Sequence, residues 1–98
     1  MYLKIHETDK GKIVAACDKE LIGKILEEGD LHMDLKTHKD FYVGELVDKA
    51  AIKEALANFS SANLVGKKVV GVAVEEGVIT PEYIKYINDV PYIQIYKI

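Results

Sequence analysis

Apolar and polar positions along the chain predict two strands at its beginning. Residues 2–7 and residues 12–17 have the composition and spacing of strands, and residues 8–11 between them have the sequence of a hairpin loop. Closing this hairpin sets Tyr2 opposite Cys17. An antiparallel pair is therefore expected to open the fold.

The pattern then changes to the period of a helix. Asp18 can cap a helix that ends at Gly29, a residue typical of helix ends, and that carries one apolar stripe of Leu21, Ile22, Ile25 and Leu26. Alternation returns in residues 31–36, and a four-residue turn leads into residues 41–47. These two segments are expected to form a second antiparallel hairpin.

Two further helices are predicted in the second half. Asp48 is expected to cap a helix with an apolar stripe from Ile52 to Phe59. Residues 64–76 allow two interpretations, because their valines favour a strand. A cap at Asn63 and a Glu-Glu-Gly ending favour a helix, which we predict.

The chain is expected to finish as a strand. Thr80 and Pro81 favour a short helical turn, and residues 92–98 alternate again. The order ββαββααβ gives an α+β class, with helices packed on an antiparallel or mixed sheet. A chain of 98 residues with 49% hydrophobic residues can bury one core, so residues 1–98 are expected to be a single domain.

Composition limits the setting of the protein. Cys17 is the single cysteine, so no intramolecular disulfide can form, and the start of the chain lacks the pattern of a signal peptide or membrane span. A cytoplasmic location without membrane contact is expected. The abundance of Lys and Glu leans towards a thermophilic source.

One short motif suggests an anion site. Residues 21–24 and residues 64–67 repeat a Leu-apolar-Gly-Lys pattern. The binding candidates at the second copy are Asn63, Gly66, Lys67 and Lys68, near the start of the predicted helix, where the dipole favours a phosphate. Local capping is the alternative. The sequence is not a standard phosphate loop, because Ser61 replaces its first glycine and Lys68 its Ser/Thr.

Catalysis and metal binding have one candidate residue and one candidate group of residues, respectively. Cys17 lies at a strand end before a predicted helix, where a nucleophilic thiolate would be stabilised. The alternative, a small buried hydrophobe, is favoured, because the register of the first hairpin places His6 well away from Cys17. The second hairpin would set His32 opposite Glu45 with Asp34 nearby, which could hold a metal or be an ordinary polar group of a sheet.

Tyrosines on the terminal strands suggest a contact surface. Tyr2, Tyr92 and Tyr96 could share one sheet face and stack on bases or contact a protein, unless a helix covers them. All 13 cations are Lys, so the planar fork that reads guanine and phosphate is missing. Binding within a larger complex is less affected, because neighbours there supply charge.

The sequence also resembles a known family. The motifs that carry the resemblance are Ala15-Ala16-Cys17-Asp18, Leu21-Ile22-Gly23-Lys24, Phe41-Tyr42-Val43-Gly44-Glu45, Ala62-Asn63-Leu64-Val65-Gly66-Lys67, Glu75-Glu76-Gly77-Val78-Ile79 and Val90-Pro91-Tyr92. In this order and spacing the chain resembles a family of small archaeal proteins catalogued as a domain of unknown function. The resemblance implies an archaeal, cytosolic, stand-alone domain and supplies no activity or catalytic residue.

Three functional hypotheses follow. The first is a non-enzymatic binding module associated with RNA, a ribonucleoprotein or a partner protein, and using no cofactor. The second is a small enzyme or ligand-binding protein that uses Cys17. The third is a structural homodimer formed along an exposed edge strand.

Overall fold

The computed structural model describes residues 1–97. In that part of the chain the strands are β1 (Tyr2–Thr8), β2 (Gly11–Cys17), β3 (Ile25–Glu28), β4 (Leu31–Asp34), β5 (Glu45–Leu46), β6 (Ser61–Val65), β7 (Lys85–Ile87) and β8 (Val90–Tyr96). The helices are α1 (Lys49–Ala55) and α2 (Lys67–Glu75), with short 3-10 turns at Lys19–Leu21, Lys39–Phe41 and Pro81–Tyr83. The expected α+β class is confirmed.

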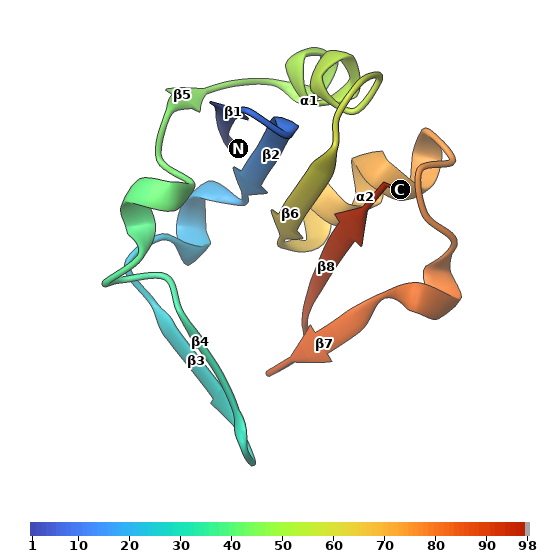
Figure 1. The fold of residues 1–98 in the computed structure, drawn as a ribbon. Coiled ribbons are helices and arrows are strands. Elements are labelled where there is room, and N and C mark those ends of the chain that lie inside the picture. The colour runs from blue at the N-terminus through green and yellow to red at the C-terminus, as the bar shows by residue number, and fades with distance from the viewer. Residues whose placement is uncertain (98) are drawn as a thin grey trace.

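The strands form one large sheet and a separate arm. The sheet has the order β5-β1-β2-β6-β8-β7, and only the β2–β6 pair among these neighbours is parallel. β3 and β4 pair with each other and form the arm, a hairpin that projects from the sheet (Figure 1). The register of β1 and β2 is the predicted one, with Tyr2 opposite Cys17.

One face of the sheet packs against α1 and α2. Val14 and Leu64 from the sheet meet Ile52 and Val69 from the helices, all of them buried. Because alternate residues of a strand point to opposite faces, these positions define the helix-side core. Neither helix within residues 1–97 has both the length and the apolar character that crossing a membrane would need.

A second, smaller core lies on the opposite face of the sheet. It contains Cys17 and Val65 from the sheet and Leu26 and Leu35 from the arm region, together with Ile87. The tip of the arm is attached to the turn between β7 and β8 by a hydrogen bond. In this bond the backbone N–H of residue 88 donates to the side chain of residue 28 over 2.7 Å. The arm therefore covers part of this face.

The helix predicted from Asp18 to Gly29 is wrong. The structure has a 3-10 turn and then β3, which pairs with β4 so that Leu26 lies opposite Met33. Gly29 and Asp30 form the two-residue loop of that hairpin, a sequence that also suits a helix end. The second hairpin is consequently β3–β4, and the segment predicted to pair with residues 31–36 contributes β5 to the edge of the main sheet.

Residues 64–76, for which a strand and a helix were both considered, contain the end of a strand followed by a helix. The segment begins in β6, a buried strand between β2 and β8, and becomes α2 at Lys67. The helix cap is Gly66, so the predicted cap at Asn63 is wrong. The predicted end is confirmed, because the backbone N–H of Val78 donates to the carbonyl of Ala73 over 3.0 Å in a glycine-containing C-terminal cap.

The remaining predictions for the second half are confirmed in outline. Asp48 caps α1 by accepting a hydrogen bond from the N–H of Ala51. The turn at Pro81 is present, and the last strand is β8. The short strand β7 was not predicted, and Ile98, the end of the predicted last strand, lies outside the described residues.

Candidate functional site

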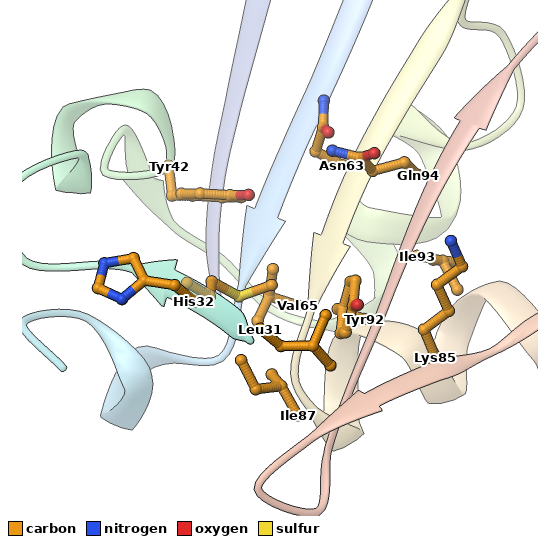
Figure 2. A pocket seen from close by; sticks show the side chains of 11 residues that line it. Leu31, His32, Tyr42, Asn63, Val65, Lys85, Ile87, Tyr92, Ile93 and Gln94 are labelled. Atoms are coloured by element: carbon orange, nitrogen blue, oxygen red, sulfur yellow. The ribbon is translucent and has the colours of Figure 1, made fainter. Parts of the chain in front are cut away.

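A groove of about 260 Å³ lies between the arm and the β6–β8–β7 side of the sheet. It opens on the face opposite the helices (Figure 2). Its lining comes from the arm, the 3-10 turn before β5, and three strands: Leu31, His32, Met33, Tyr42, Asn63, Val65, Lys85, Ile87, Tyr92, Ile93 and Gln94. Ligand pockets in proteins usually have volumes of about 300–1,000 Å³, so this groove suits a small ligand or a single residue or nucleotide of a polymer.

Strand register places the polar groups of the groove. Asn63 on β6 lies opposite Gln94 on β8, so the two amides lie side by side at one end (Figure 2). Tyr92, two residues before Gln94, points to the same face and lies opposite Lys85 on β7. The sheet thus presents two amides, a phenol ring and an ammonium group along the groove.

Two further polar groups of the lining are His32 on the arm and Tyr42 after the 3-10 turn, and β1 holds that turn in place. Lys4 Nζ on β1 bonds to the carbonyl of Asp40 over 2.8 Å, and the His6 ring stacks on Phe41 at 4.6 Å between centroids. These contacts fix the 3-10 turn against the sheet, and the Tyr42 ring reaches into the groove (Figure 2). Burial raises the pKa of Tyr42 to about 12, so its hydroxyl is a donor at neutral pH.

Four of these polar groups are free to meet a ligand. Among residues 1–97, no hydrogen bond or ion pair within the chain uses the side chains of Tyr42, Asn63, Lys85 or Gln94. Within residues 1–97 no fully buried side-chain nitrogen or oxygen lacks a partner, so the polar atoms of these four side chains keep some contact with solvent. Several polar groups thus converge in one groove between apolar side chains, which makes the groove a candidate ligand site.

Sequence reasoning found part of this site. Asn63 and Tyr92 were binding candidates and His32 was a metal candidate, whereas Tyr42, Lys85 and Gln94 were not predicted. Gln94 had a signal in the sequence, because it is the polar residue between two isoleucines of a predicted strand and therefore faces away from them. No local signal identified Tyr42 or Lys85.

The predicted anion site has a carboxylate of the chain itself at its centre. The Asp18 side chain accepts hydrogen bonds from the backbone N–H groups of Lys68 (3.0 Å) and Val69 (2.9 Å). Asp18 is buried, and Gly66 allows this approach because a Cβ at residue 66 would overlap the carboxylate. Gly66 also has a φ of +112°, which favours glycine.

The candidates Gly66, Lys67 and Lys68 therefore surround Asp18, while Asn63 lies apart in the groove. A phosphate at the start of α2 would have to displace the Asp18 carboxylate from the two N–H groups that it already occupies.

Cys17 is an interior residue of the second core. Its side chain is fully buried, and its Sγ donates to the carbonyl of Asp18 over 3.3 Å. Burial, and then the neighbouring Asp18 charge, raises the pKa of the thiol to about 12. A nucleophilic cysteine needs an accessible thiolate, so this environment favours the interpretation of Cys17 as a small buried hydrophobe.

The structure does not bring the three metal candidates together. His32 Nδ1 lies 3.1 Å from a Glu27 carboxylate oxygen, within the arm. Glu45 lies opposite Leu3 on β1, and Asp34 accepts backbone hydrogen bonds in the loop that follows β4. In the described part of the chain no three His, Cys, Asp or Glu side chains are arranged to hold a metal.

The three tyrosines of the terminal strands do share one sheet face. Tyr2 lies opposite Cys17, Cys17 beside Val65, and Val65 opposite Tyr92, so these positions form one row across the sheet. Tyr96 lies on the same face of β8 and is 72% exposed. Two strands separate Tyr2 from Tyr92, so only Tyr92 lines the groove.

Comparison with known proteins identifies the family. No curated protein matches the chain. A crystal structure of an uncharacterized conserved protein from the archaeon Methanopyrus kandleri matches with a TM-score of 0.80 and 25% sequence identity, and the match covers 97% of this chain and 89% of that one. The model of the family described as "Protein of unknown function (DUF424)" matches residues 5–98. This confirms the resemblance seen in the sequence, and the chain belongs to the DUF424 family.

Proposed function

We propose that this protein is a non-enzymatic, cytoplasmic binding module whose groove holds one base of a single-stranded RNA. The observation that carries the proposal is the pair of unpartnered amides, Asn63 and Gln94, next to Tyr92 on an open sheet face. Open sheet faces with aromatic rings are a recurring way for proteins to hold unstacked bases.

The chemistry of the groove suits a base. Each amide offers one acceptor and two donors, which matches the edge of an unpaired base. The rings of Tyr42 and Tyr92 supply surfaces for stacking, which contributes about 1–3 kcal/mol per base. The volume of about 260 Å³ is too small for a long segment.

The charge around the groove limits how the RNA is held. Lys85 is the one cation among the lining residues, and the arm carries Glu27, Glu28 and Asp30. Few phosphates can therefore be neutralised, so the base supplies most of the affinity. Within a ribonucleoprotein, neighbouring components would supply the remaining phosphate contacts.

The proposal can be tested with labelled RNA octamers of a single base type. We expect fluorescence anisotropy to detect binding of at least one octamer. The substitutions Asn63→Ala and Gln94→Ala should each weaken it by roughly tenfold, the cost of losing a good base contact. Raising the salt from about 50 to 200 mM should weaken it by about threefold, because Lys85 can neutralise a single phosphate.

The control is Tyr83→Ala, which removes a tyrosine that is 68% exposed and does not line the groove. This variant should bind as the unmodified protein does. Failure of all four octamers to bind, or binding that both amide substitutions leave unchanged, would show that the groove does not hold RNA.

A further inference from the structure

The outer edge of β7 has unpaired backbone groups at Tyr86. In the β7–β8 hairpin Tyr86 lies opposite Pro91, which has no N–H and whose carbonyl accepts a hydrogen bond from Gly66 on the β6 side. Hydrogen-bonded and non-hydrogen-bonded pairs alternate along an antiparallel ladder. The N–H and C=O of Tyr86 therefore point away from β8, towards the side of β7 where the sheet ends (Figure 1).

An apolar groove of about 350 Å³ lies beside this edge, on the helix side of the sheet. It runs between α2 and β7, and its lining residues are Lys67, Val70, Gly71, Val74, Ile84, Tyr86 and Pro91. Tyr86 is 55% exposed and the nearby Tyr83 is 68% exposed. β7 has only three residues and carries Lys85, two features by which natural sheets limit pairing at an edge, so Tyr86 is the one residue of β7 left to pair outward.

We propose that β7 pairs antiparallel with β7 of a second copy of this chain, around a two-fold axis at Tyr86. One outward donor and one outward acceptor on the same residue are self-complementary, because Tyr86 of each copy can satisfy both groups of the other. The Tyr86 rings then meet over the apolar grooves beside α2. Tyrosine is enriched at such contacts.

Charge supports a second copy as the occupant. In this antiparallel register Lys85 lies opposite Ile87 of the other copy. The turn that follows Ile87 carries Asp89, and Glu28 bonds to the backbone of that same turn. Each Lys85 therefore approaches acidic groups of the other copy, and the two-fold symmetry repeats this contact once on each side of the axis. At the two-fold axis the facing residues are the two Tyr86 side chains, so no like charges meet there.

The proposed pairing would place the two base-sized grooves of the dimer on one face of a joined sheet. A two-fold axis perpendicular to the sheet joins the two sheets into one and keeps the same faces on the same side. The two base-sized grooves then open side by side, although the pairing itself does not depend on what those grooves bind.

The first test is the mass in solution, measured by sedimentation equilibrium over a range of concentrations up to millimolar. The unmodified protein should move from 11.0 kDa towards twice that mass. Tyr86→Pro should stay at the monomer mass, because proline removes the outward N–H without breaking a bond within the chain. Ile25→Lys, a change at a 47% exposed apolar residue of the arm, should still dimerise.

Disulfide trapping tests the register and does not depend on the folding of the proline variant. Facing residues of a hydrogen-bonded antiparallel pair have Cα atoms about 5.5 Å apart, within the range of a disulfide. Mild oxidation should therefore link Tyr86→Cys into a covalent dimer, and Ile25→Cys should remain a monomer, since Cys17 is buried.

A mass of 11.0 kDa at every concentration would overturn the proposal and leave β7 as a site for some other strand. A dimer that persists in Tyr86→Pro, or that oxidation fails to link through Tyr86→Cys, would overturn it as well, because the contact would lie elsewhere.

Discussion

Asp18 connects two distant parts of the fold through one carboxylate. It follows β2 directly, and its side chain satisfies two of the N–H groups at the start of α2, some fifty residues later in the chain. A negative charge at this end of a helix is also favoured by the helix dipole. The approach requires Gly66, because any side chain there would occupy the place of the carboxylate.

Removing this carboxylate should cost more stability than removing an ordinary cap. We expect Asp18→Ala to lower the free energy of unfolding by about 2–3 kcal/mol, since it leaves buried N–H groups without acceptors. Asp48→Ala is the matched control, because Asp48 caps α1 from an exposed position and its loss should cost about 1 kcal/mol. Urea unfolding of both variants measures the difference, and equal losses would contradict the structural role assigned to Asp18.

Cys17 should make the stability sensitive to alkaline pH. Folding raises the pKa of its thiol from 9.0 to about 12, so the unfolded chain loses this proton first. The contribution of the protonated Cys17 thiol to the free energy of unfolding is therefore complete below pH 9 and is lost as the pH rises towards 12. In urea unfolding between pH 8 and pH 10, Cys17→Ala should lose less stability than the unmodified protein.

The alkylation of Cys17 gives a second measurement on the same residue. Iodoacetamide should leave the native protein unmodified at pH 8 and should react with it in urea. Rapid alkylation of the native protein would mean that a thiolate is accessible, and it would restore the enzymatic hypothesis for Cys17.

At the scale of elements, local signals predicted those parts of the fold that local interactions determine. The β1–β2 hairpin followed from its turn and strand pattern, and both its position and its register are confirmed. The cap of α1 at Asp48 and the glycine-containing end of α2 were also correct. In each case the residues that satisfy the backbone lie within a few positions of one another.

Segments that depend on distant partners were predicted less well. The apolar side chains of residues 21–26 have a helical spacing, but pairing with β4 and the second core select a strand from Ile25 onward. β6 begins in a short polar segment and is stabilised by β2 and β8 on either side. The groove has the same origin, because Tyr42, Asn63 and Lys85 come from three separate segments, so a single window of sequence could identify only some of its residues.

At the scale of the whole molecule, the sheet separates two cores with different roles. The helix-side core holds α1 and α2 against the sheet, and the ion pairs Lys49–Glu75 and Lys53–Glu76 join the two helices at the surface. The second core is smaller and holds the arm, which forms one wall of the groove. The groove should therefore depend on the second core far more than on the first.

Leu35 allows this division to be tested. Its side chain is 1% exposed in the second core, and its backbone groups bond to Gly23 and Lys24 at the base of the arm. Leu35→Ala should cost about 2–5 kcal/mol, the usual range for such a truncation, and the amides of residues 25–34 should lose protection from hydrogen exchange before those of β6.

Ile52→Ala is the matched control for this experiment, because Ile52 is equally buried but lies in the helix-side core. Its cost should fall in the same range, yet the arm should remain as protected relative to the rest of the chain as it is in the unmodified protein. If both variants lost protection uniformly, the two cores would unfold as a single cooperative unit. The arm could then not open separately, and a ligand would have to enter the groove with its wall in place.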